Sequence, residues 1–225
     1  FVAYYPAGLA ESGGQYPVVV MVNGTGVGAS KYPAVFEHLA SWGFIVVGND
    51  DPSTCTGDSA DALLAWLLNE SADPDGRFYQ KVDQANIGVC GHSQGGVGVF
   101  NAVNDNPHGG LYRCAVSLSP TDIEVAAALH MDYDPSRTDI PVLVLASNVG
   151  DVIQTEGILQ LYDTLPGPKA MARRTGSGHG EMPYTADGYV PAWFRWHLQG
   201  DEEAGRAFAG DAPELLANPL YQDQQ

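Results

Sequence analysis

The 225-residue chain has little positive charge: 10 Lys and Arg stand against 27 Asp and Glu, which gives a formal net charge of −17. A chain this acidic repels nucleic-acid phosphates, and its basic residues form no cluster longer than Arg173 and Arg174. Anionic membrane surfaces are disfavoured for the same reason. Nucleic acids and acidic lipid surfaces are therefore not expected as partners, and an uncharged substrate fits best.

Cysteines and long apolar runs are also scarce. The three cysteines, at positions 55, 90 and 114, show no CxxC motif and no metal-ligand spacing, which excludes a disulfide-built scaffold. Cys90 and Cys114 lie in strand-like runs and are expected to be buried thiols, whereas Cys55 lies in a polar loop. The apolar runs are long enough for a strand but too short for a transmembrane helix. The chain opens on a strand-like segment without a signal peptide, so we expect that an N-terminal piece has been removed.

Apolar residues make up 44% of the chain, and no repeat, low-complexity tract or linker divides it, so one domain over residues 1–225 is expected. Continuous β-branched runs alternate with helical patterns along the sequence. Strands are expected at residues 1–5, 18–22, 44–47, 87–90, 114–118 and 142–145, with a last strand at 170–174. Helices are expected from a cap at Ser30 to an end at Gly43, and at 61–69, 94–103, 123–130, 157–165, 190–198 and 202–208. This order predicts an α/β fold with a doubly wound, mostly parallel sheet.

The carboxyl ends of parallel strands are where such folds place their chemistry. After the strand at 87–90 comes Gly-His-Ser-Gln-Gly at residues 91–95, a G-x-S-x-G pattern that opens the next helix. This context predicts Ser93 as a nucleophile, held on a sharp, strained turn at a helix N-terminus. The alternative is a glycine-rich turn with an inert serine. A phosphate loop is disfavoured because Gly96 and Val97 stand where that motif needs Lys and Ser or Thr.

A second glycine-rich loop, Asn-Gly-Thr-Gly-Val-Gly at residues 23–28, follows the strand at 18–22. A serine hydrolase needs two N–H donors that point at the developing oxyanion. We expect one from Gln94, which follows the nucleophile, and the other from Thr25. The alternatives are an ordinary tight turn or a dinucleotide loop, and the latter lacks the required spacing before its third glycine.

A serine nucleophile also needs a base and an acid that orients it. His179 lies in a glycine-rich loop after the expected last strand and is the candidate base, while His92 is expected to line the pocket wall. His38, His108, His130 and His197 are expected at surface, loop or packing positions. Asp151 is the candidate acid, because Ser93, Asp151 and His179 then follow the chain order of these sheets. Asp122 is the alternative candidate acid, and the other role expected for either aspartate is to cap a turn. Asp163, in a pattern that would bury it, and Asp187 are less suited.

Together these positions resemble the α/β-hydrolase superfamily over nearly the whole chain. The resemblance is strongest to its small lidless branch of dienelactone hydrolase-like, chlorophyllase-like and cutinase-type polyester hydrolases, and residues 192–201 are similar to the terminal helix of the last group. It implies a serine carboxylic-ester hydrolase that needs neither metal nor cofactor. The chain departs from these relatives at Asn23-Gly24, where many have His-Gly or Pro-Gly, and in having Ser93 where the dienelactone group often has Cys. Thr25 and Gln94 stand where polyester hydrolases tend to have an aromatic residue and Met.

The stretch from residue 119 to 140 is where a lid would be inserted, and its length allows only a short helix. An open cleft suited to bulky or polymeric esters is therefore expected, with Gly24, His92 and Tyr184 on its wall. Trp42, Trp66 and Tyr133 are further aromatic candidates for that wall, although Trp66 is expected to pack in the core instead. The alternatives are an acyltransferase, lipase or peptidase with the same triad, or a catalytically silent binding scaffold. The relatives and the acidic surface favour a secreted or periplasmic location, with a cytoplasmic one left open.

Overall fold

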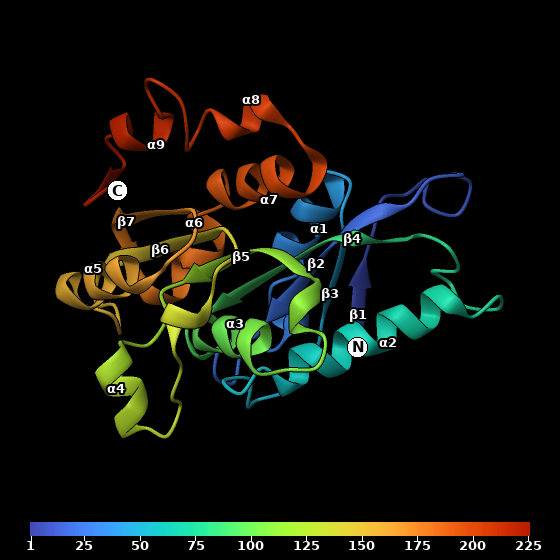
Figure 1. Cartoon of the computed structure of the whole chain (residues 1–225), viewed down its shortest axis with the longest axis horizontal. Helices are drawn as coiled ribbons and strands as arrows, with labels where there is room; N and C mark the ends of the chain where they lie inside the picture. Colours follow the sequence, from blue (N-terminus) through green and yellow to red (C-terminus); the bar gives the residue numbers. More distant parts are fainter.

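One eight-stranded sheet organises the computed structural model, which describes all 225 residues (Figure 1). The strands are β1 (Val2–Tyr4), β2 (Tyr16–Val22), β3 (Ile45–Gly48), β4 (Val82–His92), β5 (Tyr112–Leu118), β6 (Val142–Val149), β7 (Lys169–Gly178) and β8 (Tyr221–Gln222). Their spatial order is β1-β3-β2-β4-β5-β6-β7-β8. All pairings from β3 across to β7 are parallel, and only the edge strands β1 and β8 pair antiparallel. The predicted doubly wound, mostly parallel sheet is confirmed.

Helices cover both faces of this sheet. They are α1 (Pro33–Ser41), α2 (Asp58–Ala72), α3 (Gln94–Asn104), α4 (Ile123–Ala128), α5 (Thr155–Thr164), α6 (Met182–Thr185), α7 (Tyr189–Gln199), α8 (Glu202–Gly205) and α9 (Glu214–Ala217). Short 3₁₀ turns occur at η1 (Ala29–Lys31), η2 (Gly109–Leu111), η3 (Pro135–Arg137) and η4 (His179–Glu181). In Figure 1, α1 and α7 lie on one face and α2, α3 and α5 on the other.

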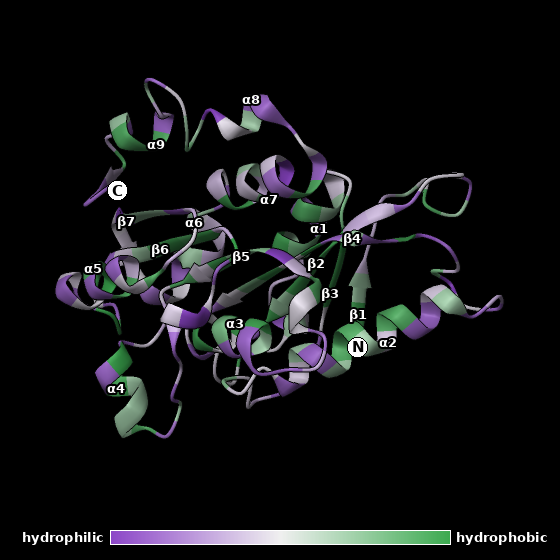
Figure 2. Ribbon diagram, viewed as in Figure 1, coloured by the Kyte–Doolittle hydropathy of each residue, from purple (hydrophilic) through white to green (hydrophobic).

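Alternate residues of β2 belong to two separate apolar cores. Val18 and Val20 pack in the core that includes residues of α2, α3 and α5, whereas Val19 and Met21 pack in the core that includes residues of α1 and α7. Because both faces of the strand are buried, its apolar run is continuous rather than alternating. Figure 2 shows the hydrophobic colour concentrated along the central strands. None of the helices has the length and apolarity that crossing a membrane requires.

Several element boundaries differ from the predictions. The first helix begins at Pro33 after Tyr32, not at a Ser30 cap, because η1 occupies residues 29–31 and proline fits the first position of a helix. β4 is eleven residues long rather than a short strand. The helix predicted at 202–208 ends at Gly205. β7 is not the last strand, because β8 pairs beside it through Arg174 and Tyr221.

The connection between β5 and β6 contains only α4 and η3, so a short helix stands where a lid domain would be inserted. In Figure 1, α4 projects from the body of the molecule below the ends of the central strands. The carboxyl ends of the central strands therefore remain uncovered by any inserted domain.

All three cysteines are free and buried. Cys55 is among them although it lies in a polar loop, and Asn101 on α3 donates to its carbonyl oxygen at 2.7 Å.

Candidate active site

Ser93 stands at the sharp turn between β4 and α3, with φ 59° and ψ −121°. A positive φ is strained for a residue with a side chain and is kept only where the surroundings enforce it. A Cβ at Gly91 would lie 2.1 Å from the Gly95 carbonyl oxygen, and a Cβ at Gly95 would lie 2.1 Å from the Val22 carbonyl oxygen. The turn is therefore possible only because both flanking positions are glycine.

The structure brings Ser93, His179 and Asp151 together at the carboxyl edge of the sheet. The Oγ of Ser93 lies 3.0 Å from Nε2 of His179, and Nδ1 of the same ring lies 2.8 Å from Oδ1 of Asp151. The three side chains come from the ends of β4, β7 and β6, which are far apart in sequence but meet at one edge. This arrangement allows the imidazole to take a proton from the serine while the carboxylate holds the ring.

Asp151 is held as a carboxylate by a dense set of donors. Its side chain is 1% exposed, and its Oδ2 accepts hydrogen bonds from Ser119 Oγ at 2.6 Å, from Ser147 N at 2.6 Å and from Ser147 Oγ at 2.7 Å. The Val152 N–H donates to Oδ1 at 2.7 Å. Burial alone would raise the pKa of Asp151, but the hydrogen bonds from His179, Ser119 and Ser147 outweigh it and hold that pKa well below its usual range.

Sequence reasoning missed Ser119 and Ser147. Ser119 follows the last residue of β5, and Ser147 lies near the end of β6. Both are polar residues that end apolar strands at the edge where Asp151 was expected. That coincidence was a usable signal, although only the structure shows that the two side chains converge on one oxygen.

His92 contacts the candidate base without replacing it. Its ring centroid is 4.7 Å from that of His179, and its Nε2 lies 2.9 Å from the His179 carbonyl oxygen. Burial, together with the neighbouring His179 ring, lowers the pKa of His92 to about 4. At neutral pH His92 is therefore uncharged, and its Nε2–H donates to the carbonyl group of His179.

The two expected oxyanion donors belong to the residue after the serine and to the loop after β2. Gln94 is the first residue of α3, so its N–H has no partner inside the helix. Thr25 is exposed on the loop after β2, and its N–H makes no hydrogen bond in the structure. A Cβ at Gly24 would lie 3.5 Å from Cβ of Ser93, which places this loop directly against the nucleophile. Neither N–H group therefore has a hydrogen-bond partner within the chain.

A small pocket of about 110 Å³ opens beside the serine. It is lined by Gly24, Val27, Tyr32, His92, Gly180, Pro183 and Tyr184, a set that includes all three expected wall residues. Trp42 and Tyr133 lie elsewhere, and their assignment to the wall was wrong, whereas Trp66 packs against the core as expected. Tyr133 is buried and stacks on Phe100. Trp42 follows the last residue of α1, with its ring 4.1 Å from the Arg195 guanidinium.

The rival acids and bases have other partners. Asp122 caps α4 by accepting from the Glu124 N–H at 3.0 Å, which is its alternative role. Asp163 is exposed, contrary to the expected burial, and Asp187 pairs with His38 on the surface. Of the remaining histidines, His108 contacts Asp61, His130 faces solvent and His197 packs on α7.

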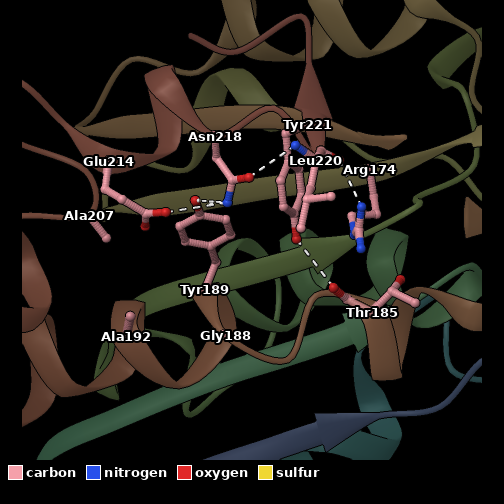
Figure 3. A pocket seen from close by; sticks show the side chains of 10 residues that line it. All are labelled: Arg174, Thr185, Gly188, Tyr189, Ala192, Ala207, Glu214, Asn218, Leu220 and Tyr221. Atoms are coloured by element: carbon pink, nitrogen blue, oxygen red, sulfur yellow. Dashed lines mark hydrogen bonds between the residues drawn. The ribbon is translucent and has the colours of Figure 1, made fainter. Parts of the chain in front are cut away.

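The largest pocket of the chain, about 290 Å³, is elsewhere, beneath the C-terminal segment (Figure 3). Its polar groups mostly bind one another. Tyr189 Oη accepts from Asn218 Nδ2 at 2.8 Å, Tyr221 Oη donates to the Thr185 carbonyl oxygen at 3.3 Å, and Arg174 donates to the Leu220 carbonyl oxygen at 2.9 Å. It contains no pairing of a nucleophile with a base. The smaller pocket beside Ser93 is therefore the candidate active site.

A parallel sheet with a serine on a strand–turn–helix junction is the architecture of the α/β-hydrolases. The chain belongs to the PET hydrolase-like family, whose model matches residues 2–213. Cutinase 1 of Thermobifida cellulosilytica is 23% identical over 176 aligned residues, which cover 73% of this chain and 62% of that protein. Chlorophyllase-1, chloroplastic, of Citrus sinensis is 28% identical over 154 residues, covering 62% of this chain and 44% of that protein. The chain thus spans less than two thirds of the length of these curated relatives, and the resemblance inferred from the motifs is confirmed.

Proposed function

We propose that the protein is a serine carboxylic-ester hydrolase. The observation that carries the proposal is the continuous contact from Ser93 Oγ to His179 Nε2 at 3.0 Å and from His179 Nδ1 to Asp151 at 2.8 Å. Ser93 attacks the ester carbonyl carbon while His179 accepts its proton, and the Thr25 and Gln94 N–H groups receive the oxyanion.

The second half of the cycle uses the same groups. His179 donates its proton to the leaving alcohol, which departs and leaves the acyl group on Ser93. A water molecule then attacks the acyl carbon as His179 takes one of its protons, and the proton returns to Ser93 when the carboxylic acid is released. Asp151 stays ionised throughout, because its pKa lies far below that of an ordinary carboxyl group.

For the substrate we propose neutral, bulky or polymeric esters, as for a cutinase-like polyester hydrolase. The pocket of about 110 Å³ is smaller than the roughly 300–1,000 Å³ of sites that enclose a drug-sized ligand, so only part of a large ester would enter it. The short β5–β6 connection leaves the remainder free to lie across the surface. Insoluble polymers stay outside cells, which is why a secreted or periplasmic location forms part of this proposal.

We also propose that residues 1–225 form a single domain. One sheet runs from β1 to β8, and each of its two cores combines residues from the first and the last third of the chain. A cooperative unfolding transition that is the same by fluorescence and by circular dichroism supports this, whereas two separated transitions contradict it.

Ester turnover tests the proposed activity. Hydrolysis of p-nitrophenyl acetate should fall at least about 10³-fold in Ser93→Ala and in His179→Ala. The variant His108→Ala changes a histidine that also contacts an aspartate but lies outside the site, and it should retain activity. Absence of turnover in the parent protein would favour the silent binding scaffold, whereas turnover that persists in Ser93→Ala would contradict Ser93 as the nucleophile. Product analysis with added alcohols or amines separates hydrolysis from acyl transfer, and a panel of triglyceride and peptide substrates separates it from lipase or peptidase activity.

A further inference from the structure

Thr54 touches both segments that carry the proposed oxyanion donors. It lies between β3 and α2 and is 0% exposed. Its Oγ1 donates to the Asn23 carbonyl oxygen at 2.7 Å, and its N–H donates to Gln94 Oε1 at 2.9 Å. The hydroxyl is also 3.2 Å from Gln94 Oε1, but it has one proton, and the backbone N–H already serves that oxygen.

The Asn23 carbonyl group immediately precedes Gly24 and Thr25. Asn23 is 0% exposed, and no other donor in the structure reaches its carbonyl oxygen. Gly95 on α3 lets this oxygen approach the helix, since a Cβ there would lie 2.5 Å from it. A buried carbonyl oxygen without a donor is costly, so the Thr54 hydroxyl fixes how far the Thr25 loop stands from α3.

Thr54 is itself held on α3. A Cβ at Gly98 would lie 2.2 Å from the Thr54 carbonyl oxygen, so the two backbones are in close contact. The carbonyl oxygens of the next two residues, Cys55 and Thr56, accept hydrogen bonds from Asn101 on α3, at 2.7 Å, and from Asn106 just after that helix, at 2.9 Å. Since α3 also begins with Gln94, one rigid helix sets the position of both donors.

We propose that Thr54 is a positioning residue that sets the spacing between the Thr25 and Gln94 N–H groups. This inference rests on the proposed function. It also accounts for glutamine after the nucleophile, because a methionine there would offer Thr54 no comparable acceptor. Preorganised donors act mainly on the charge that develops in the transition state. Loss of the Thr54 hydroxyl should therefore lower kcat while leaving KM little changed.

The test compares Thr54→Val, which keeps the shape but loses the hydroxyl, with Thr54→Ser, which keeps the hydroxyl. Thr138→Val is the matched control, because Thr138 is also 0% exposed and donates to Asn104 Oδ1 at 3.1 Å away from the site. Thr54→Val should lower kcat about ten- to a hundredfold, with KM within about threefold of the parent value. Thr54→Ser should restore most of the loss.

A trifluoromethyl ketone supplies a readout that a merely structural role would not move. Its adduct with the serine carries an oxyanion, so its inhibition constant should rise in Thr54→Val by the same factor by which kcat/KM falls. Thr138→Val should leave both values unchanged. The inference is overturned if kcat and the inhibition constant of Thr54→Val stay within about twofold of the parent values, or if Thr138→Val reproduces the loss.

Two further outcomes are separable. If Thr54→Val does not fold, Gln94→Leu is the substitute, because it removes the side-chain acceptor on α3 and keeps the backbone N–H. It should show the same linked change in kcat and in the inhibition constant. An unchanged kcat in Gln94→Leu contradicts the inference. If the parent protein itself hydrolyses no ester, the proposed function fails, and this is seen before any Thr54 variant is made.

Discussion

Replacing Ser147 by alanine removes one of the donors that hold Asp151 as a carboxylate. The lost bond, from Ser147 Oγ to Asp151 Oδ2 at 2.7 Å, is charge-assisted and lies in a site where the carboxylate is 1% exposed. Hydrogen bonds to charged groups contribute about 1.5–3 kcal/mol. The backbone N–H of residue 147 and the Ser119 hydroxyl remain, so the Ser147→Ala variant should fold and lose about that free energy of unfolding at pH 7.

The pH dependence of this loss distinguishes charge from packing. In the unfolded chain Asp151 gains a proton near its ordinary pKa of 3.8, whereas in the folded chain it stays ionised far below that pH. The stability contributed by the lowered pKa is therefore fully present above pH 3.8 and is lost as the pH falls below it. The unfolded chain is the same in both proteins, so their difference is set by the two folded-state pKa values of Asp151, of which that of Ser147→Ala is the higher. The difference should therefore be full at pH 7, should shrink as the pH falls through the folded-state pKa of the variant, and should be smaller at pH 2.

Urea unfolding at the two pH values measures this directly. Ser136→Ala is the matched control, because Ser136 Oγ donates to the carboxylate of Asp134 at 2.5 Å on the exposed surface. That control should change the free energy of unfolding by less than about 0.5 kcal/mol. An equal loss for Ser147→Ala at pH 7 and pH 2 would show that the side chain acts through packing, and would refute the account of Asp151.

Two further predictions concern acid stability and substrate size. Burial lowers the pKa of His197 from 6.5 to about 4, so between these pH values the unfolded chain binds a proton that the folded chain does not. The free energy of unfolding should therefore fall as the pH drops from 6.5 to 4, and His197→Phe should remove part of this fall in thermal melts. In the short connection between β5 and β6, Val125 on α4 and Leu129 just after it are 47% and 59% exposed, so V125S/L129S should slow polyester-film hydrolysis but not turnover of p-nitrophenyl acetate. The control L216S/L220S changes similarly exposed residues, 51% and 53%, near the C-terminus, and it should affect neither film hydrolysis nor p-nitrophenyl acetate turnover. Equal rates of film hydrolysis in the parent and both double variants would refute a role of Val125 and Leu129 in polymer contact.

Local patterns were enough to predict most of the sheet and the residues that meet at its edge. The strand at Val18–Val22 is continuously apolar because both of its faces are buried, a pattern visible in sequence. Ser93 was found because G-x-S-x-G falls between a strand and a helix, and the glycine contacts show why the spacing is required. Asp151 and His179 follow from their positions after expected strands together with the chain order, and the structure places them within hydrogen-bond distance of one another.

Features that depend on contacts distant in sequence were not predicted. β8 has only two residues and exists because Tyr221 finds a partner on β7. Tyr133 is an aromatic residue of the kind that lines clefts, but its hydroxyl group donates to the Thr121 carbonyl oxygen and its ring packs on Phe100. Thr54 lies in a polar loop with no motif, and only the fold brings its hydroxyl group to Asn23.

Mass spectrometry after treatment with a fluorophosphonate tests the central claim most directly. A serine activated by His179 should react to give one adduct per chain, located on Ser93, and the adduct should be absent in Ser93→Ala and form far more slowly in His179→Ala. Ser119→Ala should still label, since Ser119 contacts Asp151 and not the reacting atoms. An unlabelled parent protein, or an adduct on another residue, would contradict the assignment of Ser93 as the nucleophile.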